Sequence, residues 1–361
     1  MRPRNFSLKT KASPIAINFS TYARAAAADI EPVLRRRLGQ WEAEVSAQSA
    51  GGLDELTGIL AAAVGGGKLL RGALVKLGYE LAAGAPPPGV LEAAAAYEML
   101  HTGFLIHDDI MDDSSLRRGR PSAHVLAGGG RYGTAQAICL ADAAFFMAHR
   151  ALAGSGLEAV RVMQAQTDFS RIAQDTAAGQ MLDMKFARPG AARTEADVLR
   201  IYALKTAAYT ICGPLRVGGR LGGATEAQLQ TFTEYGRHVG LAYQIQDDIL
   251  GVFGTEEVVG KPVTSDISEN KNTVLIAYAH SRATSPQRQT LDRLYGRVDL
   301  SADDIASIKG IFEDCGALDY ARKLAQSEVA AAVAAAARVT ADPAQLYLLT
   351  DLAEYSVSRT S

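Results

Sequence analysis

The amino-acid sequence predicts an all-α fold, and three observations support that prediction. Alanine and leucine are frequent, whereas aromatic residues, which strands favour, make up only 7% of the chain. Segments in which β-branched residues alternate with polar ones are scarce. Long segments instead carry apolar residues at the spacing of one helix face. We therefore expect helices packed on helices, with little sheet.

Clusters of glycine, proline and serine divide the chain into the expected helices. The first helix runs from about Thr21 to Val45, and a break follows over Ser46–Leu53. Breaks are also expected at Gly65–Lys68 and Pro86–Gly89. The later helices are expected at about Leu91–Asp113, Thr134–Ala153, Leu157–Phe186, Glu195–Gly219, Thr225–Val252, Lys271–Ser281, Pro286–Tyr295, Ser301–Cys315, Leu318–Val339 and Pro343–Val357. No linker divides the chain, so we expect one domain over residues 21–361 after a flexible extension over residues 1–20.

Charge and cysteine usage exclude several classes of protein. The net charge is −2, so there is no general basic field and we expect no nucleic-acid partner. Cys139, Cys212 and Cys315 are odd in number and far apart, which indicates reduced thiols in a cytoplasmic protein. No run of 18 apolar residues occurs, so we expect no membrane span. The first residues are basic but lack the apolar core of a signal peptide.

An acidic stretch at the end of the Leu91–Asp113 segment carries the strongest functional signal. Four aspartates occupy six positions, and Arg117 and Arg118 follow them. In a helix, Asp108 and Asp112 lie one turn apart and repel each other. A divalent cation removes that repulsion, and Mg²⁺ suits carboxylates that leave positions open for water and phosphate oxygens. The arginines supply planar donors for phosphate. The alternative is a solvated, charged helix end.

A second aspartate pair makes the solvated alternative much weaker. Asp247 and Asp248 lie on another apolar helix, about 140 residues further along the chain. Two such pairs that face each other would hold several Mg²⁺ ions around one diphosphate. On a helical wheel, Tyr97, His101 and Phe104 share an arc with Asp108 and Asp112, so one wall is apolar below and charged above. That mixture is more typical of a pocket than of a core face.

Five motifs together resemble those of one known family. They are Gly66-Gly67-Lys68-Leu69-Leu70-Arg71, His107-Asp108-Asp109-Ile110-Met111-Asp112 with Arg117-Arg118-Gly119, Lys205-Thr206, Gln244-Ile245-Gln246-Asp247-Asp248-Ile249-Leu250, and Gly260-Lys261-Pro262 with Ser265-Asp266. In this order, over roughly residues 60–275, the chain resembles the trans-isoprenyl diphosphate synthases (polyprenyl synthetases), and most of all a bacterial geranylgeranyl diphosphate synthase. The resemblance implies an isoprenoid-synthase helical bundle around a central cavity, usually a homodimer. It also implies Mg²⁺-dependent condensation of an allylic diphosphate with isopentenyl diphosphate.

The resemblance also assigns roles to individual residues. The family pattern implies three Mg²⁺ ions in each active site. Asp108 and Asp112 would bind metal with Asp109 in support, and Asp247 would bind metal with Asp248 behind it; Asp113 is an alternative ligand. The allylic diphosphate would be bound by Arg117, Lys205 and Lys261, with Lys271 at the edge of the same loop. Isopentenyl diphosphate would be bound by Lys68, Arg71, His101 and Arg118. Thr206 and Gln244 would border the developing cation, and together with Lys205 they would be the catalytic residues.

Several of these assignments depend on the resemblance. Taken alone, His101 would be a core histidine, Lys205 a surface lysine and Gln244 a polar residue at a helix interface. Gln180 and Asp183 are interpreted as a capping or interface pair and are left out of the site.

The chain departs from the family pattern in two places. Gly251 stands where many members have a third aspartate in the second acidic motif. Leu69 and Gly72 replace a common arginine and proline in the first basic motif. Lys68 and Arg71, the expected phosphate contacts, are retained.

Product length is expected to depend on residues shortly before the first acidic motif. Phe104 would close the pocket fairly high, Gly103 would leave room beside it, and Tyr97 and Leu100 would line the apolar wall. We therefore expect geranylgeranyl diphosphate (C20) as the product, with farnesyl diphosphate (C15) next. The alternatives are a catalytically silent regulatory subunit of a prenyl synthase and a class I terpene cyclase. Activity that requires isopentenyl diphosphate separates the three.

Overall fold

The computed structural model describes residues 17–64, 67–188, 193–254 and 265–358, and it is almost entirely helical. The helices are α1 (Phe19–Ser49), α2 (Asp54–Val64), α3 (Leu70–Ala83), α4 (Gly89–Met111), α5 (Ala123–Leu126), α6 (Gly130–Ala153), α7 (Ala159–Phe186), α8 (Glu195–Ile201), η1 (Tyr202–Cys212), α9 (Gly213–Gly222), α10 (Glu226–Phe253), α12 (Ser265–Ser268), α13 (Val274–Arg282), α14 (Ser285–Leu294), α15 (Ala302–Asp314), α16 (Ala317–Val339) and α17 (Pro343–Ser358). The prediction of an all-α fold is confirmed. No described helix is long and apolar enough to cross a membrane.

A short antiparallel hairpin follows α4. Its strands, β1 (Leu116–Arg117) and β2 (Arg120–Pro121), pair Leu116 with Pro121 and Arg117 with Arg120. Arg118 lies in the turn between them, with a left-handed backbone at φ 53°. The hairpin therefore fixes the two arginines of the first acidic motif beside the end of α4.

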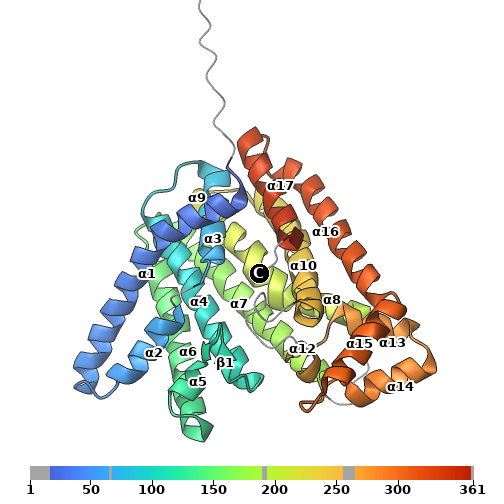
Figure 1. Ribbon diagram of the computed structural model, residues 1–361. Coiled ribbons are helices and arrows are strands. Elements are labelled where there is room, and N and C mark those ends of the chain that lie inside the picture. The colour runs from blue at the N-terminus through green and yellow to red at the C-terminus, as the bar shows by residue number, and fades with distance from the viewer. Residues whose placement is uncertain (1–16, 65–66, 189–192, 255–264, 359–361) are drawn as a thin grey trace, which may run out of the picture.

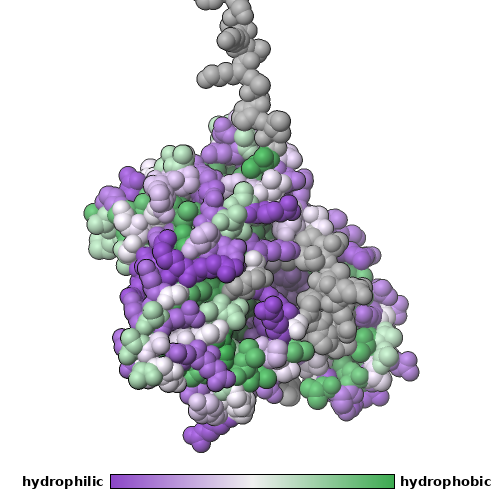
Figure 2. Space-filling view, turned by 60° about the vertical axis from the view of Figure 1, so that its left-hand side comes forward, coloured by the Kyte–Doolittle hydropathy of each residue, from purple (hydrophilic) through white to green (hydrophobic). Residues whose placement is uncertain are grey.

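The helices are arranged as the two arms of an inverted V, with α7 and α10 between them (Figure 1). One apolar core joins α1, α3, α4, α6, α7 and α9. A second core joins α13, α14, α15 and the first half of α16. Helix α10 contributes its first half to one core and its second half to the other. A cavity of about 1020 Å³ is lined by residues of α3, α4, α7, η1 and α10. The surface is hollowed near the middle of the face in Figure 2, with hydrophilic side chains at the rim.

Helices α3 and α9 pack with their backbones in contact. A Cβ atom on Gly218 would lie 1.9 Å from the carbonyl oxygen of Val75, and one on Gly78 would lie 2.2 Å from the carbonyl oxygen of Leu215. Only glycine allows this approach. The start of α3 and the end of η1 are therefore held close together, and the guanidinium of Arg71 reaches the hydroxyl of Thr210.

The segment predicted as one helix over Glu195–Gly219 has three parts. A capping box of Thr194 and Asp197 starts α8, and the backbone then widens into η1, a π-helix of 11 residues. Helix α9 completes the segment. Extended π-helical turns are uncommon and are often associated with functional sites. Here η1 carries Lys205 and Thr206 into the cavity wall.

Several predicted boundaries differ from the structure by a few residues, and two of them have a clear physical reason. Helix α1 begins at Phe19, whose ring is fully buried and whose N–H donates to Asp351 Oδ2 at 2.6 Å. Residues 19 and 20 are therefore not part of an extension, and residues 1–16 lie outside the described residues. Helix α13 begins at Val274 and not at Lys271, because the Thr273 hydroxyl caps it by accepting from the N–H of Ile276 at 3.3 Å.

The contact of α3 with α9 predicts a large cost for one methyl group. Gly218→Ala should lower the free energy of unfolding by about 1–3 kcal/mol, because the added Cβ meets backbone that cannot move aside. Urea denaturation measures the change. Gly58→Ala is the matched control, since a Cβ there meets nothing within 4 Å in α2, and it should stabilise by about 0.5–1 kcal/mol. Equal effects of the two variants would contradict the packing argument.

Candidate active site

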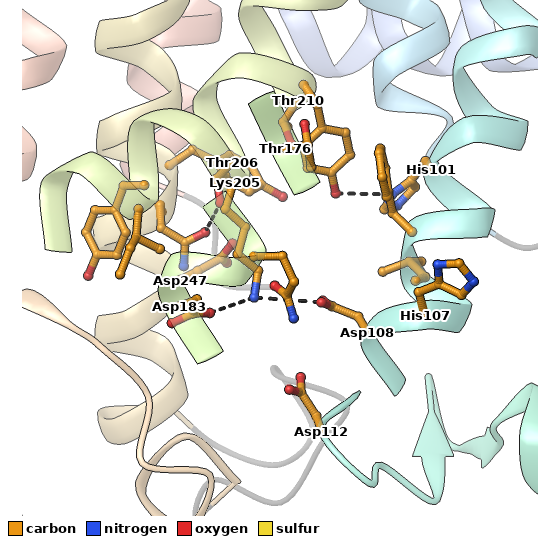
Figure 3. A pocket seen from close by; sticks show the side chains of 18 of the residues that line it. His101, His107, Asp108, Asp112, Thr176, Asp183, Lys205, Thr206, Thr210 and Asp247 are labelled. Atoms are coloured by element: carbon orange, nitrogen blue, oxygen red, sulfur yellow. Dashed lines mark hydrogen bonds and ion pairs between the residues drawn. The ribbon is translucent and has the colours of Figure 1, made fainter. Parts of the chain in front are cut away.

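The first acidic motif lies at the cavity end of α4 (Figure 3). Asp108 and Asp112 both line the cavity, and the N–H of Asp112 donates to the carbonyl oxygen of Asp108 at 2.9 Å. Burial and then the neighbouring Asp108 carboxylate raise the pKa of Asp112 to about 6. The pair is thus a strained arrangement of like charges, which a cation would relieve.

Asp109 is directed away from the cavity. It is buried and does not line the cavity, and its Oδ1 accepts from Arg117 Nε at 2.9 Å and from the Nη2 of the same guanidinium. The carboxylate therefore fixes Arg117 against the end of α4, so that Arg117 lines the cavity beside Asp108 and Asp112. This is a supporting role, as the resemblance implied, and not the position of a ligand in the cavity.

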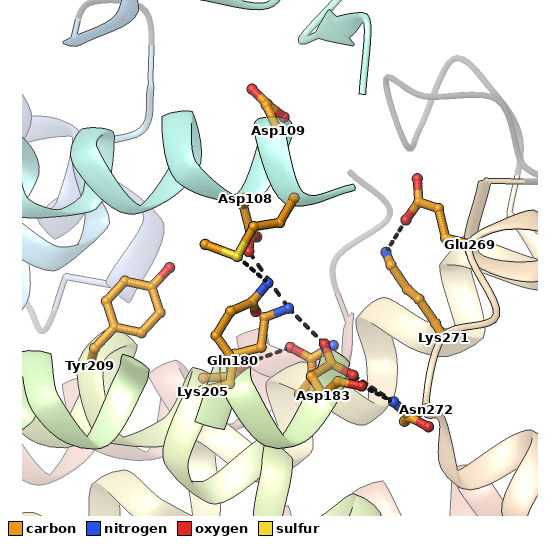
Figure 4. Close-up of polar contacts among 12 residues, drawn as sticks. Asp108, Asp109, Gln180, Asp183, Lys205, Tyr209, Glu269, Lys271 and Asn272 are labelled. Atoms are coloured by element: carbon orange, nitrogen blue, oxygen red, sulfur yellow. Dashed lines mark hydrogen bonds and ion pairs between the residues drawn. The ribbon is translucent and has the colours of Figure 1, made fainter. Parts of the chain in front are cut away.

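Lys205 lies between the acidic groups of two helices. Its Nζ donates to Asp183 Oδ2 at 2.7 Å and lies 3.7 Å from Asp108 Oδ1, so the three side chains form one row across the cavity (Figure 3). Burial by itself lowers the pKa of Lys205, but Asp108 and Asp183 more than offset this, and the pKa is raised. Asp183 is held in turn by Asn272, whose Nδ2 donates to Asp183 Oδ1 at 2.8 Å (Figure 4).

The second acidic motif belongs to a hydrogen-bonded chain from η1 to α10. Thr206 Oγ1 donates to Gln244 Oε1 at 2.7 Å, and Gln244 Nε2 donates to Asp248 Oδ1 at 2.8 Å. The hydroxyl of Tyr202 donates to the other Asp248 oxygen. Burial and then Asp266 raise the pKa of Asp248 well above its usual range. Both aspartates line the cavity. Asp248 orients the residues around it, and Asp247 lies on the wall that faces α4 (Figure 3).

A basic cluster of Lys68, Arg71, His101 and Arg118 lines another part of the cavity. Arg71 Nη2 donates to the hydroxyls of Tyr209 at 3.0 Å and Thr210 at 2.9 Å, while its buried Nε has no hydrogen-bond partner in the described part of the chain. Burial, and then Arg71 and Arg118, lower the pKa of His101 well below its usual range, so the imidazole is neutral. Donors of this kind, gathered with little acidic compensation, suit a phosphate group.

One buried acid lies beneath the basic cluster. Glu98 lines the cavity and accepts from the N–H of Gly72 at 2.7 Å. Burial raises the pKa of Glu98, although Arg71 and Arg118 act in the opposite direction. Glu98 therefore anchors the start of α3, which carries Arg71. Gly67 lies against Arg118, because a Cβ there would be 3.1 Å from Arg118 Nη2.

The apolar part of the cavity is closed by aromatic rings from three helices. The ring of Phe104 lies 5.1 Å from that of Phe145 on α6 and 5.4 Å from that of Tyr209 on η1. The space beside Gly103 is filled, since a Cβ there would lie 2.5 Å from the Phe145 ring. The expectation that Gly103 leaves room in the pocket is therefore wrong in this structure.

Tyr97 and Leu100 do not line the cavity either. Both are buried, and Tyr97 packs edge-on against Phe169 of α7 with ring centroids 5.0 Å apart. The helical wheel places Tyr97 on the same face of α4 as His101. At the level of Tyr97, however, that face packs against Phe169 of α7 and Gly213 of α9. Tyr97 is thus part of the core beneath the cavity and not of its wall.

The remaining predicted residues are Lys261 and Lys271. Lys261 lies outside the described residues. Lys271 lines the cavity and is ion-paired with Asp266, and its Nζ lies 3.6 Å from Glu269 Oε2 (Figure 4). Burial opposes the charge of Lys271, but Asp266 and Glu269 dominate and raise its pKa well above the usual range.

Sequence reasoning missed Asp183, Tyr209 and Phe145 as cavity residues, and it gave no role to Asp266, which belongs to one of the five motifs. The spacing of Gln180 and Asp183 by three residues on α7 was the available signal, since both face the cavity. Phe145 and Tyr209 carried no signal, because single aromatic residues on apolar helices are ordinary core residues.

The carboxylates present fit Mg²⁺. Asp108, Asp112 and Asp247 line one cavity from two helices and provide the oxygen ligands that Mg²⁺ prefers. No group of three or more His, Cys, Asp or Glu side chains within the described residues is already gathered as a closed metal site. Because Mg²⁺ keeps several waters and is usually shared with substrate phosphates, a few carboxylates on opposite walls are the expected donor set.

The raised pKa of Asp112 predicts that the ionised Asp112 carboxylate lowers the free energy of unfolding. Its folded-state pKa of about 6 exceeds the ordinary value of 3.8 for an aspartate, so the penalty is absent below about pH 3.8 and complete above about pH 6. Asp112→Asn should therefore raise the free energy of unfolding by about 1–3 kcal/mol at pH 8 in EDTA, with a smaller gain at pH 4.5. Urea denaturation at both pH values measures this.

Asp113→Asn is the control for this variant. Asp113 is the exposed neighbour at φ 51°, a backbone conformation that asparagine adopts readily. It should change stability little at either pH. A gain for Asp112→Asn that is the same at both pH values would refute the electrostatic explanation.

Comparison with known proteins agrees with this arrangement. The family model described as polyprenyl synthetase matches residues 54–312. A short chain isoprenyl diphosphate synthase from Methanothermobacter thermautotrophicus is 38% identical over 264 residues, which are 73% of this chain and 78% of that protein. A geranylgeranyl diphosphate synthase from Methanosarcina mazei is 33% identical and covers 81% of this chain and 86% of its own.

Solved structures show the same fold. The geranylgeranyl pyrophosphate synthase of Corynebacterium glutamicum, crystallised with isoprenyl diphosphate and magnesium, superposes with a TM-score of 0.83 and 27% identity, over 95% of this chain and 100% of that one. The aspartates and basic residues of the cavity thus lie within the segment that the family model covers. The chain belongs to the polyprenyl synthetase family.

Proposed function

We propose that this protein is a Mg²⁺-dependent short-chain trans-prenyl diphosphate synthase that condenses an allylic diphosphate with isopentenyl diphosphate. One observation carries the proposal. A single cavity has acidic carboxylates on facing walls, suited to a metal-bound diphosphate, and a separate basic cluster suited to a second diphosphate. Two anion sites in one cavity are what a condensation of two diphosphates requires.

Each group then has a defined task. We propose that Asp108, Asp112 and Asp247 would hold three Mg²⁺ ions. These ions would supply positive charge to the diphosphate that leaves the allylic substrate. Arg117 and Lys205 bind the same diphosphate from the side of α4 and η1. Because charge on the leaving group grows as the C–O bond breaks, these contacts favour the transition state over the bound substrate.

The second substrate is held where its double bond can attack. Lys68, Arg71, His101 and Arg118 bind the diphosphate of isopentenyl diphosphate, with the neutral imidazole donating one hydrogen bond. Thr206 and Gln244 border the developing allylic cation with their oxygens, which Asp248 and Tyr202 keep in place. The aromatic rings below exclude water from the cation. The released diphosphate is the proton acceptor in this proposal, since no side chain among the described residues of the cavity wall stands out for that role.

We propose geranylgeranyl diphosphate (C20) as the main product, with farnesyl diphosphate (C15) next. Phe104, which precedes Asp108 by four residues, and the Phe145 ring that packs on it close the apolar end of the cavity. This supports a short-chain product. The relative from Methanosarcina mazei is named for the C20 product, which favours the same length.

The two alternatives are less well supported. A silent subunit would not need the acids and arginines that this cavity retains. A class I terpene cyclase would not need the basic cluster around Arg71, because it binds one diphosphate.

We also propose that the chain acts as a homodimer in the cytoplasm. The neighbouring helices α6 and α7 expose Tyr132, Phe146, Val160 and Met163, each more than half accessible, which is an apolar surface suited to a second copy. Cys139, Cys212 and Cys315 form no disulfide, which supports a reducing compartment.

A product assay tests the function. The purified protein is incubated with Mg²⁺, labelled isopentenyl diphosphate and either dimethylallyl, geranyl or farnesyl diphosphate, and the chains are sized after dephosphorylation. We expect C20 or C15 chains, and a loss of turnover by orders of magnitude in Asp247→Ala with an unchanged helical spectrum. No incorporation from any primer would favour the silent subunit, and hydrocarbon formed without isopentenyl diphosphate would favour the cyclase.

The aromatic floor predicts a change of product length. Phe104→Ala and Phe145→Ala should each shift the products to chains at least one isoprene unit longer, because each removes a ring that closes the cavity. Phe186→Ala is the control, since Phe186 is half-buried at the end of α7 and does not line the cavity. Unchanged products in both floor variants would remove the pair as the determinant of length.

A further inference from the structure

The three residues from Asn270 to Asn272 connect α12 to α13, and they are bound to several helices at once. Asn270 has a left-handed backbone at φ 53°, which asparagine tolerates better than most residues. The side chain of Lys271 lines the cavity, whereas its carbonyl oxygen accepts from the hydroxyl of Tyr295 at 3.0 Å. The direction of the Lys271 side chain therefore depends on the groups that hold the backbone of this segment.

Much of that hold comes from a single guanidinium. Arg193 directly precedes Thr194, the N-cap of α8. Its Nη1 donates to the carbonyl oxygens of Asn270 at 3.2 Å and Lys271 at 3.3 Å and to Asn272 Oδ1 at 2.9 Å. Its Nη2 donates to Asn270 Oδ1 at 2.8 Å. Each of these acceptors is a neutral oxygen, so the contacts depend on the planar array of donors and not on pairing with a carboxylate.

The same segment is bound to the end of α7. Asn270 Nδ2 donates to the carbonyl oxygen of Ala187 at 2.7 Å. Asn272 is buried, and its Nδ2 donates to the carbonyl oxygen and to Oδ1 of Asp183, both at 2.8 Å (Figure 4). Because a guanidinium can only donate, Arg193 requires the amide oxygen of Asn272 on its own side. It thereby directs the amide nitrogen of Asn272 toward Asp183.

Two cationic groups of the cavity therefore depend on this connection. Lys205 Nζ donates to Asp183 Oδ2 at 2.7 Å, and Asp183 is the carboxylate that Asn272 supports. Lys271 belongs to the segment itself. The proposed function assigns Lys205 to the allylic diphosphate, and the family resemblance assigns Lys271 to the same anion. Arg71 of the other anion site is held instead by hydroxyls of η1.

We propose that Arg193 is a positioning residue for the allylic diphosphate, because it holds residues 270–272 so that Asn272 supports Asp183 and Lys271 reaches the cavity. This inference rests on the proposed function. Arg193 lies outside the five sequence motifs and is not among the residues that line the cavity. It acts only through other side chains, so it should affect binding of the allylic diphosphate more than binding of isopentenyl diphosphate.

Steady-state kinetics test this difference between the two substrates. Arg193→Lys keeps the charge but loses the planar donors, and it should raise the KM for the allylic diphosphate by at least about fivefold, with a change of less than about twofold for isopentenyl diphosphate. Arg200→Lys is the matched control, since Arg200 is an exposed arginine of α8 that pairs with Asp197. It should leave both KM values unchanged.

A purely structural role gives a different result. A variant that is only less folded would lose kcat in proportion to the folded fraction and keep both KM values. That result, or an equal rise of KM for the two substrates, would overturn the proposal.

The route through Asn272 is tested by binding without turnover. Calorimetry measures the Mg²⁺-dependent binding of inorganic diphosphate to Arg193→Lys, to Asn272→Ala and to the double variant. Each single change should weaken binding. The loss in the double variant should be smaller than the product of the two single losses, because residues of one hydrogen-bonded network are not additive. A loss equal to that product would refute this route.

The binding measurement also separates this inference from the proposed function. Diphosphate binding that weakens in Arg193→Lys, in a protein that incorporates no isopentenyl diphosphate, would refute the function and leave the role of Arg193 standing. Normal condensation, with diphosphate binding and both KM values unchanged in Arg193→Lys, would do the reverse.

Discussion

The cavity depends on basic side chains that keep its carboxylates close together. Lys205 lies between Asp108 and Asp183, and Lys271 pairs with Asp266. Carboxylates buried without such partners would protonate or separate, because their repulsion is strong where water is scarce. The carboxylates are thus held in the cavity wall by lysines from other segments of the chain. Under the proposed function, a cation and a diphosphate would redistribute these ion pairs, so the lysines that hold the carboxylates together would become contacts of the bound anion.

The positions of these charges are set by backbone packing at some distance from them. Contact between α3 and α9 through Gly78 and Gly218 brings Arg71 to the hydroxyls of η1. The wide turns of η1 then carry Lys205 and Thr206 on the wall opposite α4. Since η1 faces both α7 and α10, one irregular helix aligns the row from Asp108 to Asp183 and the chain from Thr206 to Asp248. A regular helix over the same residues would present them at a different spacing.

Much of the fold and part of the site could be predicted from the sequence, and the difference has a physical reason. Asp108, Asp112 and Arg117 were predictable because they lie close together along the chain, where local spacing fixes the relative positions of side chains. Tyr97 was misplaced because a helical wheel gives direction and not depth. Phe145 was not predictable as a site residue, because it enters the cavity from a segment distant in sequence, and only the packing of helices shows which gap it fills. The π-helix was missed for a related reason, since its apolar pattern over 11 residues does not differ from that of an α-helix.

Gly103 and Gly251 lead to a common conclusion about departures from a motif. Read along the chain, each glycine is a missing side chain, which suggests a wider pocket in one case and a weaker metal site in the other. In the structure each space is filled from another helix, by the ring of Phe145 and by the carboxylate of Asp266. The space beside each glycine is thus occupied by a side chain from another segment of the chain. It follows that neither the size of the cavity nor its number of carboxylates can be taken from the motif residues alone, and that a glycine in such a motif has to be interpreted together with the side chain that lies over it.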